Sequence, residues 1–287
     1  MITVGIAVYN EENTIEKVLN LWQAEPVDEI MIISSGSTDA TDKIIGNISK
    51  KDSRIRLITE REKKGKPSAI NKILAAAKGD IIIMSDGDVY IEPGAVDLLQ
   101  ARFSKNKIGL VAGHTVPLSS KGVSGCWMRI SCDILHDKRS KNIELDVTGN
   151  LYAIRKGIVE KIPENTTLDD VYVALGVKKK GYSIDYEPEA IVRVKGVATV
   201  GDFISQKTRT RVGWRQIHES EKADISRTPA GELAYIPKLV KYTITPIGII
   251  AVPSYLMLSA AAWLLAWWKW KTEKNYIKLW KTAKSTK

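Results

Sequence analysis

Two carboxylates flank a glycine directly after an apolar segment of the chain. Ile81–Met84 are four apolar residues, and Ser85 leads from them into Asp86-Gly87-Asp88. Hard divalent cations take oxygen ligands, and Mg²⁺ usually keeps one or two protein carboxylates together with substrate phosphates. A tight acidic turn whose carboxylates face solvent is the alternative interpretation. The position at the end of a buried strand favours the metal site.

A second polar group is basic. Lys63-Lys64-Gly65-Lys66 leads into a helical segment that continues to Asn71. A glycine-containing basic loop at the start of a helix is a favourable place for an anion. A solvated charged loop is the alternative. The residues depart from the G-x-x-x-x-G-K-[ST] pattern, so a P-loop nucleotidase is unsupported.

Two further groups are associated with helices. Thr166-Thr167-Leu168-Asp169-Asp170 precedes one helix, where it either caps the helix and suits its dipole or supplies a general base toward a hydroxyl group. Gln206, Arg209 and Gly213 share roughly one face of a basic helix predicted over Asp202–His218. The alternative for that helix is an interfacial position in which its arginines meet lipid phosphates.

Alternating strands and helices must position these groups. Between Ile2 and Met84 the apolar pattern switches repeatedly between strand and helix spacing, which predicts a parallel doubly wound sheet. Ligands bind beyond the carboxyl ends of the strands in such sheets, and Asn10, Ser35 and Asp39 lie there with Asp86. The strands predicted in this part are Ile2–Tyr9, Glu29–Ile33, Arg54–Thr59 and Asp80–Met84, and the helices are Ile15–Trp22, Ala40–Ser49 and Lys66–Ala77.

The signals are weaker after Gly94, although strands and helices can still be assigned. We expect a close backbone approach at Gly149, within the predicted strand Asp146–Ile154. The later strands are Ile108–Val116, Asp146–Ile154 and Ser183–Val194, and the later helices are Gly125–Ile134, Asp169–Lys180 and Asp202–His218.

The charge of the chain restricts its partners. The 287 residues carry a formal net charge of +10, which can indicate nucleic acid, an anionic membrane surface or phosphorylated substrates. Aromatic residues mixed with lysines over Lys269–Lys287 favour a membrane interface and argue against nucleic acid as a partner. Cys126 and Cys132 do not fit a metal-ligand pattern, and we expect free thiols in a reducing compartment. Because a strand pattern begins at Ile2, we expect no signal peptide.

One segment is long and apolar enough to enter a membrane. Ile244–Trp268 contains no charged residue, and about 25 apolar residues can cross a hydrocarbon core as a helix. Its tryptophans gather at one end, as in an aromatic belt. Pro253 can kink one helix or split the segment into a re-entrant hairpin. A buried helix of a soluble core is the third possibility.

Taken together, the motifs resemble the family 2 glycosyltransferases, which are inverting enzymes of the GT-A fold. The resemblance covers Ile2 to Trp214, and it rests on the order and spacing of seven segments. These segments are VGIAVYNEENTI, SSGSTDAT, REKKGKPSAIN, SDGD, VTGNLYAIRK, TLDDVYVAL and QKTRTRVGW. The implied fold class is α/β, a Rossmann-like, mixed but mostly parallel sheet flanked by helices, followed by C-terminal amphipathic and membrane helices.

The resemblance also implies roles for individual residues. Asp88 would hold Mg²⁺ or Mn²⁺ on the donor diphosphate, Asp86 would contact the ribose or help hold the metal, and Asp170 would be the general base. The residues expected at the donor nucleotide, its diphosphate or the acceptor are Tyr9, Asn10, Glu11, Ser35, Asp39, Lys66, Gln206 and Arg209.

Two departures from the family pattern affect these expectations. Ser34 and Ser35 stand where the family turn usually carries acids, so UDP is the default donor nucleotide and GDP stays open. Thr210 stands where the membrane-bound synthases of the family carry tryptophan, and Trp214, one turn later, is a candidate platform for the acceptor. A single apolar segment argues against a self-sufficient processive synthase.

The predicted function is transfer of a sugar from a nucleoside-diphosphate sugar to a lipid-linked or glycan acceptor at the cytoplasmic face of the cell membrane. A catalytically silent, membrane-anchored binding subunit of the same fold is the alternative, and a nucleotidyltransferase ranks last. The expected parts are a nucleotide-sugar half over residues 1–115, an acceptor half over 116–200, basic interfacial helices over 201–240, and a membrane segment with a basic tail over 241–287.

Overall fold

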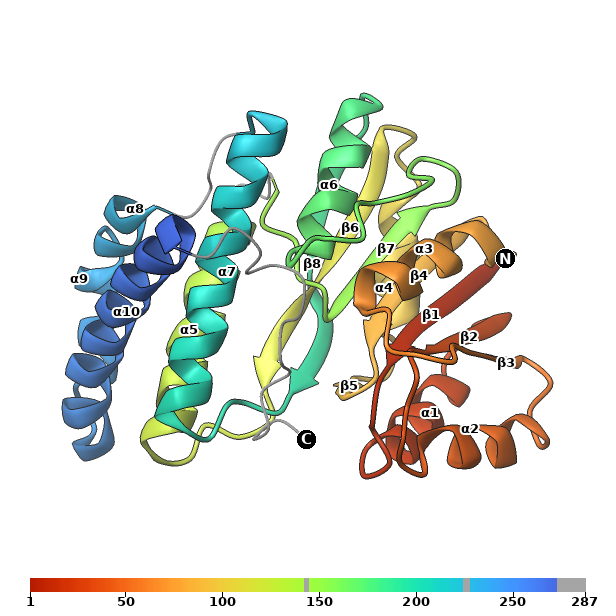
Figure 1. Ribbon diagram of the computed structural model, residues 1–287, viewed down its shortest axis with the longest axis horizontal. Coiled ribbons are helices and arrows are strands. Elements are labelled where there is room, and N and C mark those ends of the chain that lie inside the picture. The colour runs from red at the N-terminus through yellow and green to blue at the C-terminus, as the bar shows by residue number, and fades with distance from the viewer. Residues whose placement is uncertain (142–144, 224–227, 273–287) are drawn as a thin grey trace.

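The computed structural model describes residues 1–141, 145–223 and 228–272 (Figure 1). The predicted basic tail lies outside the described residues beyond Thr272. The strands are β1 (Ile2–Val8), β2 (Glu29–Ser34), β3 (Ile55–Thr59), β4 (Ile81–Asp86), β5 (Val89–Ile91), β6 (Ile108–Pro117), β7 (Leu151–Arg155) and β8 (Ser183–Val194). The helices are α1 (Ile15–Gln23), α2 (Thr41–Ser49), α3 (Lys66–Ala76), α4 (Ala95–Arg102), α5 (Gly122–Lys141), α6 (Asp169–Lys179), α7 (Val200–Glu221), α8 (Pro229–Leu233), α9 (Ile236–Leu239), the short 3₁₀ helix η1 (Val240–Tyr242) and α10 (Pro246–Thr272).

One mixed sheet organises the described chain, in the order β3-β2-β1-β4-β7-β6-β8-β5. The first four strands run parallel, which confirms the predicted doubly wound half. β7 runs antiparallel to both β4 and β6, so the second half is mixed. Val8 pairs with Ser34 and Ala7 pairs with Asp86. The loops after β1, β2 and β4 therefore leave the sheet at the same edge.

Both faces of the sheet are covered, as the continuous apolar runs of its parallel strands require. Successive residues of a strand point to opposite faces, and β2 shows this alternation clearly. Ile30 and Ile32 belong to the core cluster that includes Leu19 and Trp22 of α1. Met31 and Ile33 belong to the other cluster, on the side of α3 and α6.

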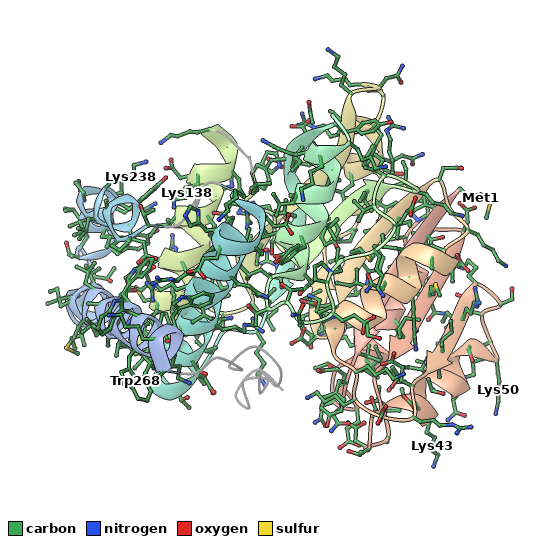
Figure 2. The ribbon with its side chains drawn as sticks, turned by 45° about the horizontal axis from the view of Figure 1, so that its top comes forward. Met1, Lys43, Lys50, Lys138, Lys238 and Trp268 are labelled. Carbon is green, nitrogen blue, oxygen red and sulfur yellow. The ribbon has the colours of Figure 1, made fainter. Side chains whose placement is uncertain are left out.

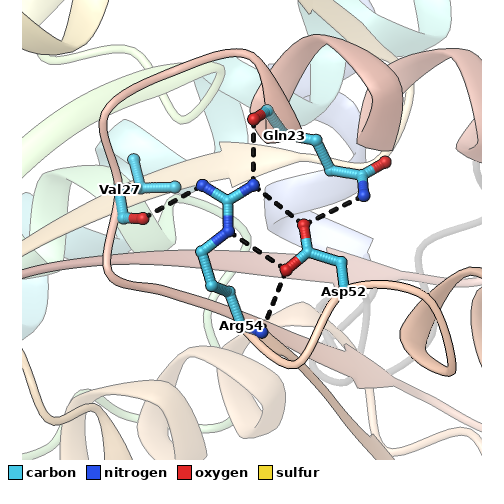
Figure 3. Close-up of polar contacts among 4 residues, drawn as sticks. All are labelled: Gln23, Val27, Asp52 and Arg54. Carbon is cyan, nitrogen blue, oxygen red and sulfur yellow. Dashed lines mark hydrogen bonds and ion pairs between the residues drawn. The ribbon is translucent and has the colours of Figure 1, made fainter.

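A polar network fastens α1 to the start of β3 (Figure 3). The Arg54 guanidinium donates to the Asp52 carboxylate at 2.8 and 3.1 Å and to the Gln23 carbonyl at 2.9 Å. The Gln23 side chain donates to the same carboxylate at 2.9 Å. Hydrogen bonds from Arg54 first, together with the bond from Gln23, hold the pKa of Asp52 well below its usual value, although burial opposes them.

A separate helical layer lies beyond the second half of the sheet. Trp127 of α5, Phe203 of α7 and Tyr255 of α10 share a third apolar cluster. Figure 1 shows α8, α9 and α10 together at one side of the molecule, with α5 and α7 between them and the sheet. α10 therefore packs on other helices and not on the sheet itself.

The structure corrects several predicted elements. The strand predicted over Asp146–Ile154 is wrong in its first part, because β7 begins only at Leu151. The carbonyl of Asp146 accepts a hydrogen bond from the Arg139 side chain, and the Asn150 amide donates to the Thr148 hydroxyl. These local bonds take the place of a strand ladder. β5 and α4 were not predicted, and α5 is longer than expected at both ends.

Candidate active site

The loops after β1 and β2 are joined by side-chain hydrogen bonds. Asn10 has a left-handed backbone conformation with φ of 54°, which asparagine tolerates better than most residues. Its backbone amide donates to the Ser37 hydroxyl at 3.2 Å, and its side-chain oxygen accepts from the Thr38 amide at 2.8 Å. The predicted nucleotide residue Asn10 thus holds two loops together at the edge of the sheet.

Asp39, also predicted at the nucleotide, has its carboxylate engaged by neighbouring donors. It accepts hydrogen bonds from the Thr41 amide at 3.0 Å, the Thr41 hydroxyl at 2.5 Å and the Glu12 amide at 3.2 Å. Burial by itself would raise the pKa of Asp39, but these hydrogen bonds outweigh it and lower the pKa. Asp39 connects the β1 loop to the first turn of α2.

Ser35 lies beneath the basic loop and is buried. Its hydroxyl donates to Glu60 at 2.8 Å and accepts from the amides of Lys64 at 3.0 Å and Gly65 at 3.1 Å. Glu60 also accepts from the Ser68 hydroxyl at 3.1 Å and pairs with Lys72 at 2.6 Å. Ser35 therefore positions the backbone of the basic loop.

The basic loop also touches the other two loops of this edge. Lys63 Nζ lies 3.9 Å from the centre of the Tyr9 ring, a cation–π contact. Gly36 has φ of +69°, and a Cβ there would lie 2.6 Å from the backbone of Glu62. Only glycine fits between these two chain segments without a shift. Tyr9 and the β2 loop thus both lie against the segment that contains Glu62 and Lys63.

Lys66 joins the basic loop to two separate carboxylates. Its Nζ lies 2.6 Å from Asp86 and 3.4 Å from Asp169. Burial by itself would lower the pKa of Lys66, but the charges of Asp169 and Asp86 outweigh it and raise the pKa. Lys66 is thus a cation surrounded by acids from β4 and α6. The two acidic motifs, far apart in sequence, meet at this side chain.

Gly149 marks the point where these groups converge. A Cβ at this position would lie 2.9 Å from Lys66 Nζ, 3.5 Å from Asp170 Oδ2 and 3.8 Å from Asp169 Oδ2. The expected close approach at Gly149 is confirmed, and the neighbour that any larger side chain would displace is the ammonium group of Lys66. Asp170, the expected base, is thus near the same cluster and half-buried.

Asp88 carries negative charge that the described cations do not neutralise. No lysine or arginine nitrogen of residues 1–141, 145–223 and 228–272 lies within ion-pair distance of its carboxylate. Burial first, and then the charges of Asp86 and Glu11, raise the pKa of Asp88 to about 7. Burial also raises the pKa of Asp86, in spite of Lys66 and Arg209. A divalent cation would fit here, with Asp88 as the carboxylate that no described cation pairs with and Asp86, which also pairs with Lys66, beside it.

The described residues contain no group of three or more His, Cys, Asp and Glu side chains arranged to hold a metal by themselves. A site built from one or two carboxylates and completed by phosphate oxygens is consistent with that finding. Asp86 and Asp88 are the residues that would hold the ion. Glu11 contributes charge nearby, while its own carboxylate accepts from the Thr14 hydroxyl at 2.9 Å.

The threonine and aspartate cluster before α6 does not cap that helix through its side chains. The residue at the cap is Leu168, which makes no side-chain cap bond. Asp169 is buried and paired with Lys66, whereas Asp170 Oδ1 accepts from the Val171 amide at 2.9 Å. The two adjacent carboxylates thus have different surroundings. Asp169 helps hold Lys66, and Asp170 is the more accessible of the pair.

The residues of α7 that were predicted at the site have different surroundings in the structure. The charge of Arg209 acts on Asp86, which places this arginine at the acidic cluster. The Gln206 side chain makes no hydrogen bond with a residue in the described part of the chain, and the backbone carbonyl of Gln206 accepts from the Thr210 hydroxyl. Trp214 is fully buried in the core, so the idea that it forms an exposed platform for an acceptor is wrong. Its apolar ring belongs to the core cluster that also contains Leu168 and Val171.

Two residues of the site were missed from sequence. Glu60 follows β3 at the carboxyl edge, where the rule applied to Asp86 would have drawn attention to it. Tyr152 looked like an ordinary core residue of β7. Its buried hydroxyl has no hydrogen-bond partner among the described residues, and it lines a cavity of about 10 Å³ together with Lys66 and Gly149. That volume admits about one water molecule.

Comparison with known proteins identifies the family of the chain. The model of glycosyl transferase family 2 matches residues 3–162, more than half of the chain. The chain belongs to glycosyl transferase family 2. The match includes the basic loop, the Asp86-Gly87-Asp88 turn and Gly149, and it ends just before the acidic pair of α6.

Relatives support the family and the fold to different extents. The poly-beta-1,6-N-acetyl-D-glucosamine synthase of Staphylococcus aureus is 26% identical over 227 residues, which are 75% of this chain and 55% of that protein. The chain thus spans about half the length of this curated relative. The mannosyltransferase PcManGT of Pyrobaculum calidifontis, solved with GDP-Man and Mn²⁺, aligns with a TM-score of 0.62 at 18% identity, over 94% of this chain and 78% of that one. TarS of S. aureus aligns with a TM-score of 0.52 at 13% identity, over 96% and 92%. These two likenesses show the GT-A fold.

Proposed function

We propose that the protein transfers a sugar from a nucleoside-diphosphate sugar to a lipid-linked or glycan acceptor, with inversion at the anomeric carbon. The observation that carries this proposal is the meeting of Lys66, Asp86, Asp88 and Asp170 at the carboxyl edge of the sheet. Direct displacement of a diphosphate requires a cation, ligands for a metal ion and a general base, and these residues would supply all three.

The donor would lie across the loops that follow β1, β2 and β4. Tyr9 and Lys63 offer an aromatic ring and a cation at 3.9 Å on the nucleotide side. Lys66 and Arg209 bring positive charge to the side of Asp86, where the diphosphate would lie. Positive groups held in place before the reaction stabilise negative charge as it develops on the leaving group.

Asp170 would act as the general base. It would accept the proton of the acceptor hydroxyl while that oxygen attacks the anomeric carbon and the bond to the diphosphate breaks. One displacement inverts the configuration and requires no nucleophile from the protein. Asp169 is the less suitable base because its carboxylate is buried and paired with Lys66.

A divalent cation held by Asp88 and Asp86 would supply neutralisation of the diphosphate charge. Mg²⁺ and Mn²⁺ both suit carboxylate ligands, and PcManGT was solved with Mn²⁺. UDP is the default nucleotide. GDP stays open because Ser35 here binds the basic loop and because PcManGT was solved with GDP-Man. The name of the staphylococcal relative supports a glycan acceptor. The predicted place of action is the cytoplasmic face of the cell membrane.

The test is release of nucleoside diphosphate by the purified protein, first with UDP- and GDP-sugars and Mn²⁺, then with added acceptors. We expect Asp170→Asn to lower kcat by about 10²- to 10⁴-fold, the usual contribution of a general base. The KM for the donor should change little, because Asp170 would contact the acceptor. Asp88→Asn should instead abolish the response to Mn²⁺.

Asp97→Asn is the matched control, since Asp97 is an exposed acid on α4, away from the site. It should behave like the wild type. Equal activity of the Asp170→Asn variant and the wild type would reject Asp170 as the base. Binding of a sugar nucleotide without turnover, in the wild type and in every variant, would favour the alternative of a catalytically silent binding subunit.

A further inference from the structure

The helix α10 has two distinct faces along its whole length. Its packed face carries small and apolar residues that are buried at intervals of three and four positions, which is the spacing of one helix face. These residues are Gly248, Ala251, Tyr255, Leu258, Ala262 and Ala266. They lie against α5 and α7. In the described residues it is the only helix long and apolar enough to cross a membrane.

The opposite face of α10 is apolar and open to solvent. We call it the exposed stripe, and its members also follow each other at intervals of three and four positions. They are Ile249, Pro253, Met257, Ala260, Leu264 and Trp267. Met257 is 66% exposed and Leu264 is 71% exposed. The stripe runs parallel to the helix axis for about 27 Å, at 1.5 Å per residue.

The exposed apolar surface is concentrated in one region. Among the described residues, eleven of the fifteen exposed large apolar side chains lie between Leu233 and Trp268. Figure 1 shows that α8, α9 and α10, which carry most of this region, lie on the same side of the molecule. Exposed apolar side chains concentrated in this way are typical of an interaction site.

The charges and aromatic rings around the stripe fit a lipid surface. Lys241 precedes α10, and Lys269 and Lys271 lie in its last turn. Lys271 Nζ lies 4.3 Å from the centre of the Trp267 ring. Tryptophan and lysine together are typical of the boundary between lipid headgroups and acyl chains. Figure 2 shows Lys238 and Trp268 at the end of the molecule opposite Lys43 and Lys50.

The packing of α10 decides how it can meet that surface. Basic side chains of α7 lie against it at three levels. Lys207 donates to the Tyr255 hydroxyl at 3.1 Å, and the Arg211 guanidinium lies 4.7 Å from the Trp263 ring. The Arg215 guanidinium lies 5.3 Å from the Trp270 ring. Fifteen residues of helix separate the first level from the last, which is about 22 Å.

A spanning orientation would place these basic groups at the depth of the hydrocarbon. Charged side chains at that depth are costly, and Arg211 is also paired with Glu232 at 2.7 Å, which accepts from Trp263 at 3.1 Å as well. Unpacking α10 from α7 would break this network. A bilayer that touches only the exposed stripe leaves every one of these contacts intact.

We infer that α10 lies in the plane of a membrane surface, with the exposed stripe in the boundary between headgroups and acyl chains, and that the described chain does not cross the bilayer there. α7 then lies one helix layer above the membrane, with Arg211 toward α10 and Arg209 toward the acidic cluster. Membrane binding through α10 is independent of the proposed sugar transfer.

The first test is flotation of the full chain with vesicles of phosphatidylcholine that contain phosphatidylglycerol. We expect the partition coefficient of the double variant Met257→Glu/Leu264→Glu to fall by at least about tenfold, because two apolar side chains no longer enter the lipid. Leu118→Glu is the matched control, since Leu118 is an exposed apolar residue outside the stripe. It should float like the wild type. A far-ultraviolet dichroism melt confirms that each variant folds.

The second test measures depth. An environment-sensitive fluorophore is attached to single cysteines at positions 249, 257 and 264, which all lie in the exposed stripe, with Cys126 and Cys132 replaced by alanine. We expect similar, shallow quenching by lipid-bound quenchers at all three positions. Deeper quenching at 257 than at both other positions would show a spanning helix and overturn the inference. Failure of the wild type to float would also overturn the inference. So would a dimer that forms without lipid and is abolished by the double variant, because a second copy of the chain would then cover the stripe.

Discussion

Ser35 shows how one hydroxyl can take on a positioning role. From sequence, the serine pair after β2 was a departure from an acidic turn that contacts the nucleotide. In the structure, the Ser35 hydroxyl connects Glu60 to the amides of Lys64 and Gly65. Burial by itself would raise the pKa of Glu60, but the bonds from Lys72, Ser35 and Ser68 lower it. The β2 loop thus carries Ser35 where the family has an acid, and the acid in contact with this serine is Glu60, which follows β3.

Ser35→Ala should therefore destabilise the fold. The substitution leaves a buried carboxylate and two loop amides each without one hydrogen bond, which costs about 1–3 kcal/mol. The measurement is the free energy of unfolding in urea. Ser34→Ala is the control, because Ser34 is equally buried and, among the described residues, its hydroxyl makes one hydrogen bond, to that of Ser37 at 2.9 Å. Equal losses for both variants would contradict the positioning role of Ser35.

Beside the apolar clusters, a few polar and charged networks connect helices and strands of this protein. Asp52, Arg54 and Gln23 connect α1 to β3 (Figure 3). Arg211, Glu232 and Trp263 connect α7, α8 and α10. Lys66, Asp86 and Asp169 connect α3, β4 and α6. Each network joins segments whose contact no local pattern determines.

The Asp52 network should make stability depend on pH. The pKa of Asp52 is lowered in the folded protein, whereas an unperturbed aspartate titrates near a pKa of about 3.9. Its contribution is complete above that value and is lost as the pH falls toward the folded pKa. Asp52→Asn should cost about 1–2 kcal/mol at pH 6, and the cost should shrink progressively below about pH 4.

Urea unfolding of the wild type and the Asp52→Asn variant at both pH values measures this difference. Asp97→Asn is a suitable control, because Asp97 is exposed on α4. A difference between wild type and Asp52→Asn that stays constant from pH 6 to pH 3 would show that the carboxylate charge is not the source of the stabilisation.

At the scale of the whole molecule, the metal should bind together with the nucleotide. The described residues offer only Asp86 and Asp88 as ligands, without a third carboxylate, histidine or cysteine arranged beside them. Mn²⁺ alone should raise the Tm little, and Mn²⁺ with the cognate nucleoside diphosphate should raise it clearly. Ligand at about a hundred times its Kd adds about 2.7 kcal/mol of stability.

The matched variant for this experiment is Asp88→Asn, which should abolish the joint increase in Tm while it keeps the fold. Relief of repulsion among Asp86, Asp88 and Glu11 should leave its Tm without ligand at or above that of the wild type. Full stabilisation of the variant by Mn²⁺ and nucleotide would exclude Asp88 as a ligand.

Local patterns were enough for the first half of the fold. The runs of apolar residues and their helical spacings predicted β1 to β4 with α1 to α3, because burial on both faces of a parallel sheet demands such runs. The same patterns located the Asp86-Gly87-Asp88 turn and the basic loop at one edge. In the second half, β7 was placed too early and β5 and α4 were missed. The short strand β5 is defined by its pairing with β8, which lies far away in the chain, so no local pattern reveals it.

The sequence by itself determined the family, the carboxyl edge at which the site forms, and the residue types that its chemistry needs. Only the tertiary structure decided how those residues are shared: Asp169 pairs with Lys66, Asp170 is the more accessible, Ser35 holds a loop, and Trp214 is in the core. It also showed that α10 packs along α7. The physical reason is that hydrogen bonds and ion pairs depend on distances of a few ångströms between segments far apart in the chain, and these distances are set only when the whole core packs.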